Sequence, residues 1–380
     1  SVRAKTGLVL DAYFSATKVA WILDHVDGAR ARADRGELAF GTIDSFLVHK
    51  LSDASAHVID VTNASRTLLM DLATSAWDTE LCAIFRVPPA MLPSIVGSAE
   101  IVARTRNVGF LPDGIPVAGI AGDQQAALFG QACFRQGDAK STYGTGAFVL
   151  MNVGHTPIAS RSGLVTTVAW RVGTKTTYAL EGSAFIAGAA VQWLRDGLGL
   201  VASAAEIEAL ARLVPSTEGV SFVPALSGLG APHWDPHARG TITGITRGTT
   251  KAHLARATLE GIGWQVDDLV RAMQADAGRP LTALKVDGGA AANDLLMQFQ
   301  SDVSDVVVSR PKEIESTGRG AAMLAAVGSG LVPWDGVSEV PAALSKLVEE
   351  DRRFTPSMSD AERSARHDVW AKAVAAAKVH

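Results

Sequence analysis

The sequence has little cysteine, a small net charge and no long hydrophobic run. Its two cysteines, Cys82 and Cys133, lie far apart without a CxxC pair, which excludes a disulfide framework and a cysteine-based structural zinc site. We therefore expect two reduced thiols in a cytoplasmic protein. The formal net charge of −4 argues against a nucleic-acid partner. The longest apolar runs, 184–190 and 321–327, are too short to cross a membrane.

What is present is typical of a globular protein with a large core. Hydrophobic residues make up 47% of the 380 residues and charged residues 19%. A chain of this length usually exceeds one hydrophobic core, so we expect two domains. Helix and strand patterns alternate around a hairpin-rich middle region, which predicts an α/β fold. The texture changes between Gly130 and Lys140, and the expected domains are therefore residues 1–132 and 133–380.

Periodicity predicts the main elements. Helices are expected where apolar residues recur every three to four positions, over 13–25, 78–86, 124–131, 184–195, 204–213, 252–276, from 293 and over 320–327. Strands are expected in β-branched runs at 58–61, 115–120, 141–153, 164–180, 220–224, 284–286 and 306–309. Residues 42–51 fit either a strand or a helix, and the charged tail from Ser357 predicts a surface helix. Helical patterns also contain Trp21, Trp193 and Trp264, which we expect to pack in the core or between domains.

Three glycine-rich turns could hold phosphate oxygens. The sequence has neither a Walker loop, G-x-x-x-x-G-K-[ST], nor a G-x-G-x-x-G fingerprint that opens a βα unit. It has instead Tyr143–Gly146 (YGTG), Ala187–Ala189 (AGA) and Asp287–Asn293 (DGGAAAN). Backbone N–H groups without a neighbouring β-carbon let a phosphate approach closely. Each turn alone is more often structural, because glycine is the default residue of tight turns.

Asp123 is the sharpest single candidate for a catalytic residue. It follows the predicted strand 115–120 and a glycine, and two glutamines come directly after it. A kinase that acts on an alcohol needs a carboxylate to accept the hydroxyl proton while a metal spreads the phosphoryl charge. The alternative is that Asp123 is only the N-cap of the helix that follows, and the local sequence by itself favours that alternative.

Taken together, the motifs resemble the FGGY family of carbohydrate kinases, and within it the members that phosphorylate glycerol. Ala118–Gly130 (AGIAGDQQAALFG) is similar to the catalytic block of those members, and Tyr13–Leu23 (YFSATKVAWIL) is similar to the family's first signature. Further blocks that match are GTID at 41–44, DVTNASRT at 60–67, STYGTG at 141–146, QWLRD at 192–196, GLGAP at 228–232 and MQFQSD at 297–302. The resemblance covers nearly the whole chain.

The resemblance implies two actin-like ATPase domains of the ribonuclease-H type, with the active site in the cleft between them. It also implies phosphorylation of glycerol by ATP, with Mg²⁺ near Asp123, which would act as the base. Tyr13 and Gln124 would hydrogen-bond the glycerol hydroxyls, and Phe148 would lie against the carbon backbone. ATP would be contacted by Thr145, Gly188, Gln192, Gly289 and Asn293. Family members commonly form dimers or tetramers, so a homo-oligomer is expected.

The start of the family's pattern has no counterpart in this sequence. The first strand with its D-x-G-T-T-[ST] phosphate-binding hairpin is absent, as are an Arg-Glu pair and a Trp that clamp glycerol, because Ser1 falls after all of them. We therefore expect the first domain to be truncated at its N-terminus, and a protein made solely of these residues to lack useful kinase activity. Two alternatives stay open, which are a related kinase of the pentulose class and an inactive nucleotide-binding fragment. Asn107–Gly114 also lacks the arginine of a Gly-Gly-x-Arg loop, so inhibition by fructose 1,6-bisphosphate is not expected.

Overall fold

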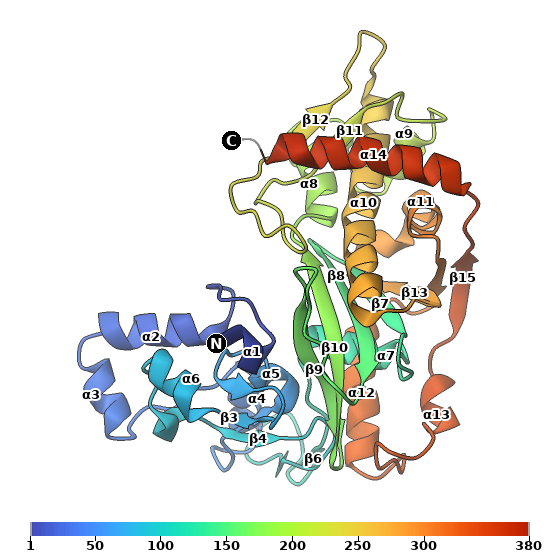
Figure 1. The fold of residues 1–380 in the computed structure, drawn as a ribbon. Helices are drawn as coiled ribbons and strands as arrows, with labels where there is room; N and C mark the ends of the chain where they lie inside the picture. Colours follow the sequence, from blue (N-terminus) through green and yellow to red (C-terminus); the bar gives the residue numbers. More distant parts are fainter. Residues whose placement is uncertain (1, 379–380) are drawn as a thin grey trace.

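In the computed structural model, which describes residues 2–378, the chain forms two parts that meet along one edge of a large sheet (Figure 1). The C-terminal part is built on a seven-stranded sheet with the strand order β15-β14-β13-β7-β8-β10-β9. The N-terminal part, at the lower left of Figure 1, carries short helices and small two-stranded sheets. This mixed α/β architecture agrees with the fold class expected from the alternating patterns.

Parallel and antiparallel strands are mixed in the large sheet. β13 (Ala283–Asp287) runs parallel to β7 (Ala139–Tyr143) and to β14 (Val307–Pro311). A two-residue turn containing Gly173, with a φ of 56°, joins the neighbouring antiparallel strands β9 and β10, as the predicted hairpin requires. The other strands, all in antiparallel pairs, are β8 (Ala147–Gly154), β9 (Val165–Val172), β10 (Lys175–Ala184) and β15 (Glu350–Phe354).

Helices cover both faces of this sheet. On one face lie α10 (Lys251–Ala277) and α11 (Asp294–Ser304), and the hydroxyl of Tyr143 in β7 donates to Gln300 Oε1 of α11 at 2.9 Å. On the other face lies α7 (Asp123–Gly130), which crosses α12 (Ser316–Gly328). Since successive side chains of a strand point to opposite faces, each strand supplies apolar residues to both helical layers. The main core therefore lies on the two sides of this sheet.

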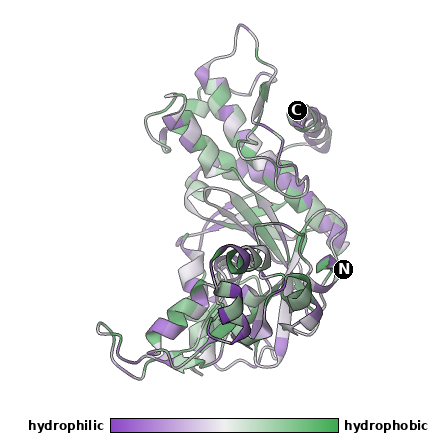
Figure 2. Cartoon of the chain, turned by 90° about the vertical axis from the view of Figure 1, so that its left-hand side faces the viewer, coloured by the Kyte–Doolittle hydropathy of each residue, from purple (hydrophilic) through white to green (hydrophobic). Residues whose placement is uncertain are grey.

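The N-terminal part is built from small elements. Its helices are α1 (Val2–Thr6), α2 (Ser15–His25), α3 (Ala29–Asp34), α4 (Ile43–Leu51), α5 (Val61–Ala64) and α6 (Thr79–Ile84), with a 3₁₀ turn, η1, at Pro89–Met91. Its strand pairs are β1 (Val58–Asp60) with β4 (Ser94–Val96), β2 (Met70–Asp71) with β3 (Ala76–Trp77), and β5 (Ala103–Arg104) with β6 (Pro116–Val117). Hydrophobic and hydrophilic residues are interspersed along these helices, which face the viewer in Figure 2. The helix expected over 78–86 begins at Asp78, which caps α6 because its carboxylate accepts from the Leu81 N–H at 2.8 Å.

The remaining elements lie above the large sheet as it is drawn in Figure 1 or next to its edges. The predicted C-terminal helix is confirmed as α14, but one of its sides is buried, because Trp370 stacks on Trp264 of α10 at 6.3 Å between ring centroids. The bounds are α8 (Gly188–Asp196), α9 (Glu206–Ala211), β11 (Ser221–Val223), β12 (Thr241–Thr243), η2 (Gly289–Ala292), α13 (Ala342–Ser345) and α14 (Asp360–Ala377).

Two expectations were wrong and one ambiguity is resolved. The buried strand expected over 115–120 is only a two-residue strand, Pro116–Val117, because the pairing segment β5 offers two residues and Ile115 is exposed. Trp21, expected to be packed, is 60% exposed on α2, whereas Trp264 is buried as expected. Residues 42–51 form the helix α4 and not a strand. Periodicity alone does not show which partner a segment finds.

The α7–α12 crossing is close because glycines lie at the contact. A β-carbon on Gly320 would overlap the carbonyl oxygen of Ala126, and one on Gly130 would overlap that of Ser316. We expect Gly320→Val to lower the free energy of unfolding by about 3 kcal/mol, because overpacking forces the two helices apart. Thermal unfolding followed by circular dichroism measures this effect.

The matched control is Gly248→Val, since a β-carbon at Gly248 meets only Thr246 Oγ1 at 3.7 Å. If Gly320→Val and Gly248→Val unfold at the same temperature, the close packing of α7 on α12 is not needed for stability.

Candidate active site

The N-terminus of α7 presents Asp123 to solvent. The N-cap of this helix is Gly122, and no side chain caps it, so the interpretation of Asp123 as the cap residue is wrong. The Gly122 N–H donates to Thr62 Oγ1 at 2.8 Å, which ties the start of α7 to α5. Asp123 Oδ1 accepts only from the next backbone N–H, that of Gln124, at 2.8 Å, and the carboxylate is exposed. Asp123 Oδ2 accepts from the Gln124 side chain at 3.2 Å, and the carboxylate is therefore bonded to Gln124 while it stays open to solvent.

The far end of α7 is anchored to the sheet. Lys285 of β13 donates its ammonium to the carbonyl oxygens of Gln131 and Ala132 at 2.7 and 2.9 Å. Arg319 of α12 donates to the carbonyl oxygen of Gly130 at 2.8 Å. Cations at a helix C-terminus satisfy its last carbonyls and its dipole. These two side chains hold α7, and with it Asp123, at a fixed place against the sheet.

One face of the sheet collects polar side chains beneath α7. Thr142 and Phe148 are paired across β7 and β8, and Ser183 of β10 is paired with Phe148. Because paired residues share a face, the side chains two positions away, Lys140 and Glu181, lie on the same face. Lys140 donates to Gln124 Oε1 of α7, which shows that this face is turned toward the start of α7. The strand register therefore gathers Phe148, Gln124 and Asp123 around one region.

Tyr13 approaches this region from the N-terminal part. Its ring is in edge contact with Phe14, with centroids 5.3 Å apart, and the Arg66 guanidinium lies over Phe14 at 5.2 Å. Partial burial, followed in importance by the Glu181 carboxylate, raises the pKa of Tyr13. The ring remains 58% exposed, so its hydroxyl can still reach a ligand. Tyr13 is thus near the polar group beneath α7 while belonging to a different part of the chain.

A cavity of about 480 Å³ brings together all five residues expected to contact ATP. Thr145 belongs to the β7–β8 turn, Gly188 and Gln192 to α8, and Gly289 and Asn293 to the segment between β13 and α11. The lining also includes apolar side chains. Among them are Val191, Ile207, Leu259, Ile262 and Leu296. A turn rich in N–H groups beside an apolar slot can take a phosphate chain at one end and a planar base at the other.

Two of the glycines at this cavity are required for different reasons. A β-carbon on Gly188 would lie 2.6 Å from the carbonyl oxygen of Gly144, so a side chain there would push α8 away from the turn. The Gly188 N–H donates to that same oxygen at 2.9 Å. A β-carbon on Gly289 meets nothing within 4 Å, so a side chain there would extend into open space beside the cavity. Gly188 allows α8 to pack closely against the β7–β8 turn, and Gly289 leaves the space beside the cavity unfilled.

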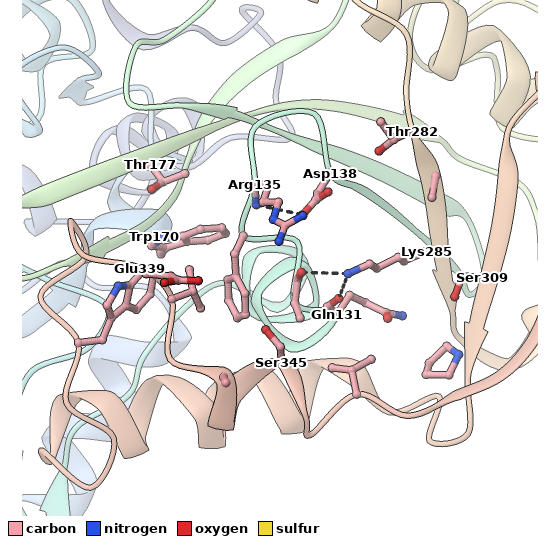
Figure 3. Close-up of a pocket in the computed structure, with 18 of the residues that line it drawn as sticks. Gln131, Arg135, Asp138, Trp170, Thr177, Thr282, Lys285, Ser309, Glu339 and Ser345 are labelled. Carbon is pink, nitrogen blue, oxygen red and sulfur yellow. Dashed lines mark hydrogen bonds between the residues drawn. The ribbon is translucent and has the colours of Figure 1, made fainter.

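A larger concavity, of about 880 Å³, lies elsewhere and contains none of the predicted site residues (Figure 3). It is lined by Arg135, Asp138, Trp170, Thr177, Ser309 and Glu339, among others. Its one lysine, Lys285, points toward the end of α7, and the dashed lines in Figure 3 mark its two bonds to backbone carbonyls. Lys285 therefore supports the end of α7. Because its ammonium is already bonded, the concavity has no free lysine that could bind an anion.

Sequence reasoning missed three charged groups beneath α7. Arg66 and Glu181 form an ion pair of 2.6 Å that joins the two parts of the chain, and Glu181 is buried. Lys140 is fully buried in β7. Arg66 stands within the quoted DVTNASRT block, which could have drawn attention to it. For Lys140, the available signal was a single charged residue inside a short strand whose other residues are all uncharged.

Residues 2–378 hold neither a membrane-spanning helix nor a cluster of metal-binding side chains. None of the helices in this range is long and apolar enough to cross a membrane. Nor does this range hold a group of three or more His, Cys, Asp or Glu side chains arranged to bind a metal ion. Both cysteines are free and buried, and burial raises the pKa of Cys133 to about 12.

Comparisons with known proteins agree with this geometry. The model of the FGGY family of carbohydrate kinases matches residues 1–130 with its N-terminal domain and residues 139–329 with its C-terminal domain. The glycerol kinase of Myxococcus xanthus (strain DK1622) is 57% identical over 375 residues, which are 98% of this chain and 74% of that protein. The glycerol kinase of Deinococcus radiodurans is 55% identical over 378 residues, which are 100% of this chain and 74% of that protein.

Solved structures extend the comparison to the fold. The crystal structure of Plasmodium falciparum glycerol kinase with ADP matches with a TM-score of 0.92 at 37% identity, over 100% of this chain and 74% of that one. A ligand-bound xylulose kinase from Lactobacillus acidophilus matches with a TM-score of 0.85 at 21% identity, which shows a shared fold. The fold thus defines a carbohydrate kinase with the two-domain, actin-like architecture. The chain belongs to the FGGY family of carbohydrate kinases.

Proposed function

We propose that this protein transfers a phosphoryl group from ATP to glycerol and so makes glycerol 3-phosphate. The observation that carries the proposal is the convergence of Thr145, Gly188 and Asn293, far apart in sequence, on one cavity together with the other two predicted ATP contacts. The names of the relatives from Myxococcus xanthus and Deinococcus radiodurans support glycerol as the acceptor. Their identity to this chain exceeds 50% over nearly its whole length.

The site residues take roles that follow from their chemistry. Asp123 accepts the proton of the attacking hydroxyl, because it is an exposed carboxylate at the start of an anchored helix. Tyr13 and Gln124 hydrogen-bond the glycerol hydroxyls, and the Phe148 ring lies against the carbon chain. The five cavity residues hold ATP, so that the phosphoryl group, the hydroxyl and the base are brought into line.

Mg²⁺ is proposed as the resident metal, with Asp123 beside it. Mg²⁺ usually keeps several waters and binds through one or two carboxylates plus phosphate oxygens, so one aspartate fits this requirement without a dedicated cluster. When bound, the ion neutralises charge on the phosphates. The protein's own part is to present one exposed carboxylate at the start of α7.

Several further features are proposed together with the activity. We place the domain boundary at residue 132, which leaves α7 at the end of the first domain and the large sheet in the second. We propose a cytoplasmic location, in agreement with two free cysteines, and a homo-oligomeric state, as is common in the family. Sedimentation velocity tests the assembly, and a monomer at micromolar concentration would contradict it.

A substrate panel separates glycerol from the pentulose alternative. ADP production is measured with glycerol, xylulose and ribulose in a joined protein, in which the N-terminal segment of the Myxococcus xanthus relative precedes these 380 residues. Turnover is expected with glycerol, and preferential turnover with a pentulose would replace the proposal. Calorimetric titration of the 380-residue chain with ATP and then with glycerol tests the alternative of an inactive fragment.

Gly289→Val is expected to weaken ATP binding by at least tenfold, by roughly 1.4 kcal/mol. The added side chain enters the open space beside the cavity, and its β-carbon meets no protein atom within 4 Å, so the fold should stay intact. Calorimetry gives the affinity, and thermal unfolding checks the fold. Gly248→Val, in a loop outside the lining of the cavity, serves as the matched control. Equal ATP affinity in the two variants would remove this cavity from the proposal.

A further inference from the structure

Lys140 is the most unusual charged group in the described part of the chain. Its side chain is fully buried in β7, on the face turned toward α7. Its ammonium donates to Gln124 Oε1 and, at 2.8 Å, to Thr142 Oγ1. Both acceptors are neutral, and no carboxylate of residues 2–378 lies within ion-pair distance of it. A buried ammonium without a paired carboxylate is costly, so it is retained for a reason other than stability.

The bond to Lys140 fixes which way the Gln124 amide points. An ammonium can only donate and a carboxylate can only accept. The amide oxygen of Gln124 must therefore face Lys140, and its NH₂ group is left for the other side. There, Gln124 Nε2 donates to Asp123 Oδ2 at 3.2 Å, while the Gln124 backbone N–H donates to Asp123 Oδ1 at 2.8 Å. Both oxygens of the Asp123 carboxylate are thus held by Gln124, and Gln124 is held by Lys140.

The charges around Lys140 agree with a role in the site. Burial lowers the pKa of Lys140, and the acidic groups that oppose this shift are Asp287 of β13, Glu181 of β10 and Asp123 of α7, in that order. The carboxylates come from three different elements packed around the ammonium. None of them contacts the ammonium directly, and its donors are directed to Gln124 and Thr142.

We propose that Lys140 is a positioning residue, which fixes the Gln124 amide and, through it, the orientation of the Asp123 carboxylate. The inference rests on the proposed phosphoryl transfer to glycerol and deepens it. Without the ammonium, the Gln124 amide can rotate and Asp123 loses the bond to Oδ2. Catalysis is sensitive to such losses of orientation, whereas ATP binding in the separate cavity is not.

A double-mutant cycle tests this chain of contacts in the joined protein. Lys140→Met is expected to lower kcat about 20-fold with the KM for ATP within about twofold, since positioning acts on the reacting groups. Gln124→Ala is expected to cause a similar or larger loss. Because Lys140 acts through Gln124, the double variant should be no slower than the slower single variant. Losses that multiply in the double variant would overturn the inference.

Further variants separate positioning from folding. Lys140→Gln restores a donor toward Gln124 Oε1 and should regain part of the kcat that Lys140→Met loses. A purely structural role predicts no higher kcat for Lys140→Gln than for Lys140→Met. Lys175→Met, at an exposed lysine of the β9–β10 hairpin, is the control and should keep the parent kcat. If the parent shows no glycerol-dependent ADP production, the proposed function fails. If the parent phosphorylates glycerol and the kcat losses of the two single variants multiply in the double variant, only the proposed role of Lys140 fails.

A second measurement does not depend on turnover. In the ¹⁵N spectrum of the 380-residue chain, the side-chain NH₂ resonance of Gln124 is assigned by its disappearance in Gln124→Ala. It is expected to move in Lys140→Met and to stay in place in Lys175→Met. An unmoved resonance in a folded Lys140→Met variant would show that the ammonium does not hold the amide.

Discussion

Asp123→Asn is expected to lower kcat by about 10³-fold, which is the usual contribution of a positioned general base. The substitution keeps the shape of the side chain but removes the carboxylate that accepts the hydroxyl proton. The bond from the Gln124 N–H at 2.8 Å can still be accepted by the amide oxygen, so the start of α7 should keep its conformation. Single-turnover and steady-state assays of the joined protein with glycerol and ATP measure the loss.

ATP binding should change less than about twofold in this variant, because Asp123 lies outside the residues that line the nucleotide cavity. Asp368→Asn, on the exposed side of α14, is the matched control and is expected to turn over like the parent. Turnover of Asp123→Asn within tenfold of the parent would remove Asp123 from the role of base. A loss of folding, seen by circular dichroism, is not expected from an exposed first-turn residue.

The expected ATP contacts show how much of the candidate site can be predicted from the sequence. YGTG, AGA and DGGAAAN are each ordinary turns in isolation, and only the family resemblance joined them into one site. The structure supplies the physical reason, which is that β7 and β13 are parallel neighbours in the sheet. The turn after β7 and the segment after β13 therefore meet at one edge, and the first turn of α8 is bonded to the same turn through Gly144.

Other features could not be read from local pattern. The apolar run 115–120 has the composition of a buried strand, but a strand forms only where a partner offers free N–H and C=O groups, and β5 offers two residues. Trp21 follows a helical pattern, and the pattern does not tell whether anything covers that side of the helix. The role of Lys140 can be inferred only once α7 is known to pack over β7, because that packing brings Gln124 to the ammonium. In each case the missing information lies in a distant segment.

The structure also gives the proposed role of Asp123 a physical basis that the sequence motif did not supply. The alternative of a simple N-cap failed because Gly122 occupies that position and no side chain caps the helix. Lys285 and Arg319 hold the far end of α7, while Thr62 and Lys140 act at its start. These contacts come from both parts of the chain. The helix that carries the proposed base is therefore a fixed element between the two parts, against which glycerol and ATP would be brought together.

A protein made only of these 380 residues is expected to turn over glycerol at least about 10²-fold more slowly than the joined protein, because the phosphate-binding hairpin and the glycerol clamp expected from the family resemblance have no counterpart among these residues. The matched region spans 74% of the Myxococcus xanthus relative, so that protein has residues beyond the shared region. In these residues, β1 and β4 form a parallel pair with no third strand, although parallel sheets are normally covered and extended. Large apolar side chains also lie exposed on α2 and α4, among them Trp21 and Phe46 at 60% and 57%.

ATP binding gives the internal control for this prediction. The residues that line the nucleotide cavity run from Tyr143 to Leu296 and belong to the C-terminal part, so the 380-residue chain should still bind ATP. Calorimetry and ADP production are measured on both proteins at equal concentration. Turnover of the shorter protein within tenfold of the joined one would contradict the prediction. Loss of ATP binding as well would mean that the large sheet depends on the added segment for its fold. The expected result is that ATP binding is retained while turnover is lost. Binding of the nucleotide should need only the C-terminal part, whereas its alignment with glycerol should need both parts.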